Sequence, residues 1–168
     1  MEIKRTIISK SLKESAKFAE AFVGNLIISK NKLKSATVVG LSGDLGTGKT
    51  AFTKAAAKHL GIKSKVNSPT FVIMKRYPIR AGNTLRALAI SDGASPIKHH
   101  QFKFLYHLDA YRLKNAKELL HLGWREMVKN PENIIFIEWP ENVKTVMPKK
   151  YHKIRISHTK EGYRNFKI

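Results

Sequence analysis

The 168-residue chain has no cysteine, few acidic residues and no long apolar run. Without cysteine it can form neither disulfides nor thiolate metal sites. No apolar stretch is long enough to span a bilayer, and the first residues lack the apolar core of a signal peptide. We therefore expect a cytoplasmic protein with no membrane association, folded as one domain over residues 1–168.

Acidic residues are scarce, and their scarcity is regional. Twelve Asp and Glu residues stand against 32 Lys and Arg, which gives a formal net charge of +20. Between residues 53 and 117 the acidic residues are Asp92 and Asp109. Such a surface attracts polyanions, and tRNA, rRNA, DNA and acidic proteins all qualify. A lysine-rich proteome, high salt or low pH would explain the charge equally well, so charge alone selects no partner.

The order of apolar patterns predicts an α/β chain. Strand-like runs cover residues 3–8, 36–41, 71–77, 102–108 and 134–137, and residues 154–157 and 163–168 look like a closing antiparallel pair. Helical spacing follows a capping box at Ser11 and Glu14, and further helices are expected at residues 49–60, 114–122 and 124–129. Residues 78–101 show no clear period and read as a long loop or an irregular hairpin.

One motif carries recognisable chemistry, the pattern G-x-x-x-x-G-K-[ST]. Its glycines allow backbone N–H groups to turn inward around phosphate, and the following helix points its positive N-terminus at the same oxygens. The lysine reaches the β- and γ-phosphates, and the final hydroxyl is offered to Mg²⁺. A buried-strand pattern precedes the motif and a helix follows it, as an ATP site requires. Its residues are Gly43, Asp44, Leu45, Gly46, Thr47, Gly48, Lys49 and Thr50.

This motif fixes the expected architecture. We expect a three-layer P-loop NTPase-like domain whose mostly parallel sheet carries helices on both faces, closed by the antiparallel pair. The strand ending at Leu41 should lie centrally, beside the strand that begins at Ile134 or one removed from it.

Two carboxylates end predicted strands and are candidates to act beside the phosphates. Glu138 follows four apolar residues and would hold Mg²⁺ or orient the attacking water. The alternative is a surface glutamate that merely ends a strand. Asp109 follows residues 104–108 and should stay ionised among cations, although it could instead pair with Arg112.

Two other side chains have both a functional and a structural interpretation. Thr70, after Pro69, could sense γ-phosphate and Mg²⁺ or could simply belong to a turn. Trp139 could stack on a partner or brace the switch loops, or it could close the core. His107 is interpreted as a packed strand residue, and His99–His100 lack matching ligands at zinc spacing.

Four segments in this order resemble the TsaE family, the P-loop ATPases of tRNA threonylcarbamoyladenosine biosynthesis. They are the P-loop, Ser68-Pro69-Thr70-Phe71, His107-Leu108-Asp109-Ala110-Tyr111-Arg112-Leu113 and Ile137-Glu138-Trp139-Pro140-Glu141. The resemblance implies an accessory ATPase that acts with the proteins TsaD and TsaB to modify adenosine 37 of tRNAs reading ANN codons, with feeble hydrolysis on its own.

The same resemblance assigns roles to residues. Thr50 and Glu138 would hold Mg²⁺, Asp109 would be essential for hydrolysis, Trp139 would be needed for function and Glu141 would lie near the nucleotide. The chain departs from the family in a basic insertion at about residues 78–103, which contains Arg80, Arg86, Lys98 and Lys103. It also departs near Gly162, where Tyr163 precedes Arg164, which leaves the base-side contact open.

Two other functions are compatible with the sequence. A small nucleoside or metabolite kinase shares the fold, and residues 80–86 could imitate its arginine-bearing lid. A non-catalytic nucleic-acid-binding module with a vestigial nucleotide site is the third hypothesis. The intact set of Lys49, Thr50, Asp109 and Glu138 argues against a decayed site.

Overall fold

The structure is a computed structural model that describes residues 5–28, 33–80 and 102–168. Within these ranges one sheet of seven strands runs through the molecule in the order β1-β7-β6-β2-β5-β4-β3. The strands are β1 (Thr6–Ser9), β2 (Thr37–Ser42), β3 (Met74–Pro78), β4 (Phe104–Asp109), β5 (Asn133–Glu138), β6 (His152–His158) and β7 (Arg164–Lys167). The helices are α1 (Leu12–Ile28), α2 (Lys49–His59), α4 (Ala116–His121), α5 (Trp124–Lys129) and the 3₁₀ helix η1 (Pro140–Val146).

Strand β2 occupies the middle of the sheet. It pairs in parallel with β5 on one side and with β6 on the other, and β4 continues the parallel part beyond β5. The remaining strands β3, β7 and β1 pair antiparallel at the two edges. The predicted fold class is confirmed, including the central position of the strand that ends near Leu41 and its pairing with the strand that contains Ile134.

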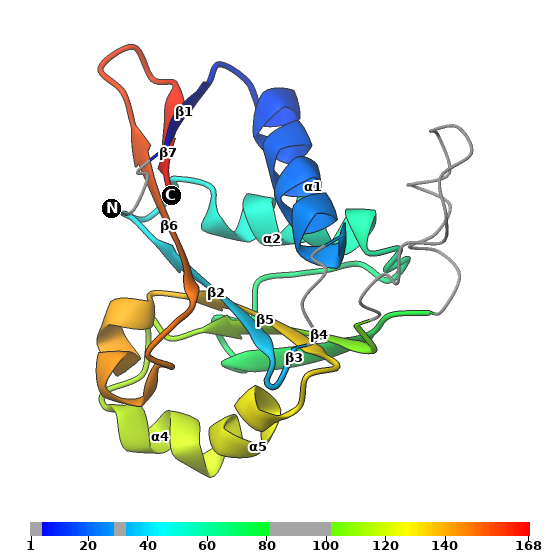
Figure 1. The fold of residues 1–168 in the computed structure, drawn as a ribbon. Helices are drawn as coiled ribbons and strands as arrows, with labels where there is room; N and C mark the ends of the chain where they lie inside the picture. Colours follow the sequence, from blue (N-terminus) through cyan, green and yellow to red (C-terminus); the bar gives the residue numbers. More distant parts are fainter. Residues whose placement is uncertain (1–4, 29–32, 81–101) are drawn as a thin grey trace, which may run out of the picture.

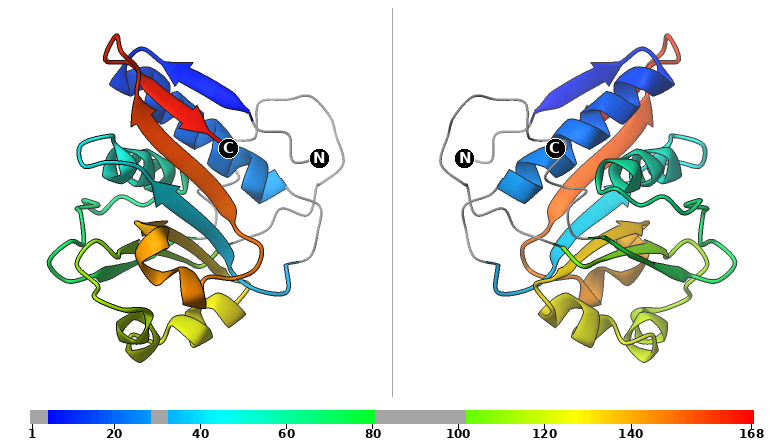
Figure 2. Two further views of the ribbon diagram at one scale, coloured as in Figure 1. Left: turned by 90° about the vertical axis from the view of Figure 1, so that its left-hand side faces the viewer. Right: turned by 90° about the vertical axis from the view of Figure 1, so that its right-hand side faces the viewer.

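Helices cover both faces of this sheet (Figures 1 and 2), with α1 and α2 on one side and α4, α5 and η1 on the other. Side chains of β5 alternate between the two layers. Ile134 and Phe136 pack with α1 and α2, whereas Ile135 and Ile137 pack with α4 and α5. All six positions of β5 are buried, as expected of a parallel strand covered on both faces.

Rings from helices and strands fill the core below α1 and α2. Phe18 and Phe52 meet with their ring centroids 5.6 Å apart, and Phe166 of β7 lies 5.0 Å from Phe18. Phe136 of β5 is 6.3 Å from Phe52. Because Phe52 belongs to α2, this aromatic cluster fixes the helix that follows the P-loop against the sheet.

The helix ends follow the expected capping chemistry with small differences. The hydroxyl of Ser11 accepts a hydrogen bond from the backbone N–H of Glu14 at 3.1 Å. The carboxylate of Glu14 accepts from the N–H of Lys10, one residue earlier than the capping box predicts. Helix α4 begins at Ala116 rather than Lys114, because Asn115 forms a complete capping box with Glu118.

The strand predicted at residues 71–77 was wrong in its first half. The carbonyl of Pro69 accepts hydrogen bonds from the N–H groups of Val72 and Ile73, at 2.9 and 2.6 Å, so the chain turns here. Ile73 also adopts a positive φ of 64°. These bonds use donors that a strand would give to its neighbour, and β3 therefore begins only at Met74.

The two ends of the predicted insertion lie side by side. The N–H of Ile79 donates to the carbonyl of Lys103 at 2.8 Å, which extends the β3–β4 pairing beyond both strands. Ile79 and Phe102 are buried there. The predictions for Arg86, Lys98 and His99–His100 fall outside the described residues.

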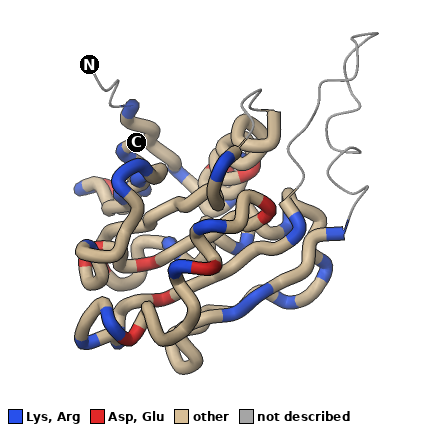
Figure 3. Tube along the Cα trace, turned by 60° about the horizontal axis from the view of Figure 1, so that its bottom comes forward, with Lys and Arg blue, Asp and Glu red and all other residues tan. Residues whose placement is uncertain are grey.

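Positive charge is widely distributed. Figure 3 shows Lys and Arg along most of the described trace, with few Asp and Glu among them. None of the helices in the described ranges is both long and apolar enough to cross a membrane. The distribution of charge therefore marks no single element as a partner surface.

Candidate functional site

Residues 43–48 connect β2 to α2 through a loop whose backbone needs glycine at three positions. Gly43, Gly46 and Gly48 have φ values of 136°, 78° and 107°. A Cβ atom on Gly43 would overlap the carbonyl oxygen of Ile156 on β6. The loop therefore depends on its glycines both for backbone conformation and for close packing against the sheet.

The ammonium group of Lys49 lies inside this loop. Its Nζ donates to the carbonyls of Gly43 and Asp44, at 2.7 and 2.8 Å, and the side chain is 4% exposed. Burial lowers the pKa of Lys49, and the negative charges of Glu138 and Asp109 offset part of that shift. Among the described residues, the hydrogen bonds of this buried cation go to neutral backbone carbonyls, so it is well placed to exchange them for phosphate oxygens.

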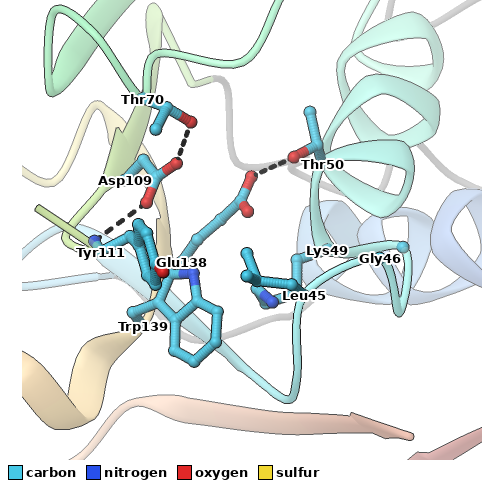
Figure 4. Close-up of a pocket in the computed structure, with 10 residues that line it drawn as sticks. Leu45, Gly46, Lys49, Thr50, Thr70, Asp109, Tyr111, Glu138 and Trp139 are labelled. Carbon is cyan, nitrogen blue, oxygen red and sulfur yellow. Dashed lines mark hydrogen bonds between the residues drawn. The ribbon is translucent and has the colours of Figure 1, made fainter.

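Two carboxylates meet opposite the loop. Asp109 and Glu138 are register partners at the ends of β4 and β5, and they are 4% and 3% exposed. The Oε1 atom of Glu138 accepts a hydrogen bond from the hydroxyl of Thr50 at 2.8 Å. Figure 4 shows Glu138 reaching toward Thr50 of α2. The register thus brings the end of β5 to the start of the P-loop helix.

Asp109 is engaged by the segment that follows Pro69. Its Oδ2 accepts a hydrogen bond from the hydroxyl of Thr70, and its Oδ1 accepts from the N–H of Tyr111 at 3.0 Å. Arg112 does not pair with it among the described contacts. The Arg112 guanidinium lies over the ring of Phe71, 4.4 Å from the centroid. Thr70 therefore belongs to a turn and to the site at once.

These side chains enclose a cleft of about 290 Å³. It brings together most of the predicted site and adds Tyr111 (Figure 4). The lining residues are Leu45, Gly46, Gly48, Lys49, Thr50, Thr70, Asp109, Tyr111, Glu138 and Trp139. Thr47 stabilises the loop from within, since its buried hydroxyl donates to the carbonyl of Asp44 at 2.9 Å.

Trp139 covers one side of the cleft. Its ring centroid lies 4.0 Å from Nζ of Lys49 and 5.2 Å from the ring of Tyr111. The residue has a positive φ of 59°, and its N–H donates to the carbonyl of Leu41 at 3.0 Å. Trp139 is only partly buried, so it borders both the core and the cleft.

Glu141 lies beside the cleft and not in it. It is exposed in the first turn of η1, a helix that the sequence patterns did not predict. With Gly43 and Asp44 it lines a neighbouring hollow of about 370 Å³. Its negative charge opposes the lowering of the Lys49 pKa by burial, so Glu141 acts electrostatically on the P-loop.

Two further residues join the site: His107, which was not predicted there, and Arg164, whose contact the sequence left open. His107, interpreted as a packed strand residue, is fully buried, and its Nε2 lies 2.8 Å from Oε1 of Glu138. Alternation along β4 could have placed it on the face of Asp109, because residues two apart share a face. Arg164 of β7 donates from Nε to the carbonyl of Thr47 at 3.2 Å, so it sits against the loop.

The donor set suits a magnesium ion that arrives with a nucleotide. Among the described residues no group of three His, Asp or Glu side chains gathers as a separate metal site. A hydroxyl and a carboxylate do meet, at Thr50 and Glu138. Mg²⁺ commonly takes one or two protein ligands and completes its shell with phosphates and water, so this pair fits it.

Comparison with known proteins identifies the family. The sequence profile described as "Threonylcarbamoyl adenosine biosynthesis protein TsaE" matches residues 9–166. The chain belongs to the TsaE family. Members carry the name tRNA threonylcarbamoyladenosine biosynthesis protein TsaE, and the match covers every residue placed in the cleft.

Individual TsaE proteins are similar over most of their length. The Bacillus subtilis (strain 168) protein is 32% identical over 160 residues, covering 95% of this chain and 80% of that protein. The Borreliella burgdorferi protein is 34% identical over 140 residues, covering 83% and 81%. The crystal structure of Bacillus subtilis YdiB superposes with a TM-score of 0.67 at 25% identity, covering 99% of this chain and 85% of that one.

Proposed function

We propose that this TsaE protein is an accessory Mg²⁺-dependent ATPase of the machinery that forms threonylcarbamoyladenosine in tRNA. One observation carries the proposal, namely the meeting of the P-loop residues Lys49 and Thr50 with the strand-end carboxylates Asp109 and Glu138 in one cleft. A P-loop, a strand-end carboxylate and a threonine of a turn are the recurring parts of phosphoryl-transfer sites.

Each residue has a task that its contacts suit. Lys49 would leave the carbonyls of its own loop and bind the β- and γ-phosphates. Thr50 and Glu138 would hold the magnesium ion, which supplies charge neutralisation on those phosphates when bound. Asp109 would orient the attacking water, and its bond to Thr70 would couple that water to the turn at residues 69–73.

We infer the partners from the family. The TsaE resemblance points to TsaD and TsaB, in the cytoplasm, with tRNA reached through their complex. The turn that contains Thr70 also exposes Phe71 and Val72, which are 84% and 57% exposed. A segment bonded to a catalytic carboxylate and exposed to solvent is a suitable place for partner proteins to influence hydrolysis.

Steady-state ATP hydrolysis, measured with and without TsaD and TsaB, tests the proposal. We expect slow release of phosphate by the chain alone and a clear increase when both partners are present. Including nucleosides and small metabolites as acceptors separates the kinase alternative. Transfer of phosphate to an acceptor without partners, or absence of hydrolysis in the complete mixture, would contradict the ATPase assignment.

A further inference from the structure

A fully buried histidine lies behind the carboxylate of Glu138. His107 of β4 is 0% exposed, and its Nε2 is 2.8 Å from Oε1 of Glu138. An ionised carboxylate only accepts hydrogen bonds, so Nε2 is the protonated ring nitrogen and its N–H is the donor. Because the hydroxyl of Thr50 donates to the same oxygen at 2.8 Å, Glu138 is held from β4 and from α2 together.

The strand register explains why this histidine reaches the site. His107 is the register partner of Phe136, and Asp109 is the partner of Glu138. Side chains two apart on a strand share a face, so His107 and Asp109 both point to the layer of α2. His107 therefore lies two residues further from the strand end than Asp109, on the same face.

Among the described residues, the ring of His107 has a polar contact with Glu138 alone. Within the described part of the chain its Nδ1 has no hydrogen-bond partner, which leaves Nε2 as the only bonded nitrogen. Burying a polar ring with an unpaired nitrogen is unfavourable, and an aliphatic side chain would pack there at less cost. The bond to Glu138 is the contact that an aliphatic residue could not replace.

We propose that His107 is a positioning residue that fixes the carboxylate of Glu138 for the magnesium ion of the Mg²⁺–ATP complex. This inference rests on the proposed function. A glutamate carboxylate rotates broadly about its last torsion when nothing holds it. The bonds from His107 and Thr50 both end on Oε1, so Oε2 keeps its lone pairs available to the ion or to a water bound to it.

Three variants separate positioning from packing. His107→Gln keeps a side-chain N–H donor near the place of Nε2, and His107→Leu fills the space without a donor. Leu105→Val is the matched control, because Leu105 is also fully buried on the same face of β4 and has no contact with the cleft in the described structure. Melting temperature is measured on all three.

The deciding measurement is ATP affinity by calorimetry, in Mg²⁺ and in EDTA, on the full chain. Loss of an outer-shell partner typically costs 10- to 100-fold in metal affinity. We expect His107→Leu to lower the affinity in Mg²⁺ by about that factor relative to the affinity in EDTA. His107→Gln should recover most of this loss. Leu105→Val should lower the melting temperature without changing the ratio of the ATP affinity in Mg²⁺ to that in EDTA.

The outcomes distinguish the two proposals. A wild-type ratio in folded His107→Leu would overturn the positioning role and leave the ATPase proposal standing. Equal changes of the ratio in His107→Gln, His107→Leu and Leu105→Val would overturn it too, since they would report packing. A wild-type chain that binds no ATP under either condition would overturn the proposed function and the role of His107 with it.

Discussion

Strands β4 and β5 have two faces, and they differ in chemistry. On the face covered by α1 and α2, the last residues are His107, Asp109 and Glu138. On the face covered by α4 and α5, their neighbours Leu108 and Ile137 are apolar and at most 1% exposed. At these strand ends the residues of both faces are buried, so burial does not separate them.

The difference shows that the face covered by the P-loop helix is the one that can carry the site. The P-loop opens into α2, and its Thr50 reaches only the face that α2 covers. Polar residues on that face therefore meet the loop, whereas polar residues one position away would be buried beside α4 or α5 without partners. We expect substitutions on the two faces to separate activity from stability.

The largest expected effect compares the two tryptophans. Trp124, on the α4–α5 side, is 1% exposed and donates from Nε1 to the carbonyl of Val146 at 2.8 Å. Trp124→Ala should lower the free energy of unfolding by about 3–5 kcal/mol. Trp139→Ala should cost only about 1 kcal/mol, because its ring is partly exposed, yet remove partner-stimulated hydrolysis.

Thermal unfolding and stimulated ATP hydrolysis would be recorded on the same preparations. An equally large loss of stability in Trp139→Ala would make this residue part of the core. Full stimulated activity in Trp139→Ala would remove its functional role.

Neighbouring residues of β5 sharpen the comparison. Glu138→Gln keeps the size of the side chain and loses its charge, so turnover with partners should fall about 100-fold while ATP binding falls less. Ile137→Val removes one methyl group from the other face and should cost about 1 kcal/mol of stability with turnover retained. Equal turnover in wild type and Glu138→Gln would exclude the metal role of Glu138.

Lys49→Ala tests the loop itself. This change removes a charged hydrogen-bond donor from the phosphates, and such bonds contribute about 1.5–3 kcal/mol. ATP affinity measured by calorimetry should therefore fall roughly 10- to 100-fold. An unchanged affinity would place the nucleotide elsewhere in the molecule.

Thr70→Val tests the turn that bonds Asp109. The substitution preserves shape and removes the hydroxyl donor, so stimulated turnover should fall about tenfold with little change in melting temperature. Ser68→Ala is a suitable control, because its hydroxyl contacts Thr70 and, among the described contacts, has no hydrogen bond to Asp109. A larger effect in the control than in Thr70→Val would contradict the assignment.

The smallest expected effect is a pH dependence of stability. Burial lowers the pKa of Lys49 from 10.5, so between the folded and unfolded pKa values the unfolded chain binds more protons. Stability of the nucleotide-free protein should therefore gain a contribution as pH rises through that window. Lys49→Met lacks this contribution, so the melting temperature of wild type relative to Lys49→Met should rise with pH across that window. A difference in melting temperature that does not change with pH would contradict the burial of the Lys49 cation.

Much of the fold could be predicted because its signals are local. The glycines and lysine of residues 43–50 specify the loop, and the apolar run before Glu138 specifies β5. Helix α5 lies at the predicted residues 124–129. The P-loop motif and the strand-end positions of Asp109 and Glu138 predicted that these residues share one edge of the sheet with Lys49 and Thr50.

The remainder depends on contacts between distant segments. The turn after Pro69 continues into apolar residues that also suit a strand, and the short 3₁₀ helix η1 is mostly polar with no helical period, so periodicity gave no sign of either. The bond between His107 and Glu138 requires the β4–β5 register, which no single segment contains. Arg164 reaches Thr47 across 117 positions of the chain, beyond the range of any local pattern.

The most direct test of the site is a crystal structure with Mg²⁺ and a non-hydrolysable ATP analogue. The account predicts that Nζ of Lys49 leaves the carbonyls of Gly43 and Asp44 for the phosphates. It also predicts a magnesium ion about 2.1 Å from the hydroxyl of Thr50, with Glu138 bound to it directly or through one water. A nucleotide bound outside the loop, or a magnesium ion in contact with neither Thr50 nor Glu138, would contradict it.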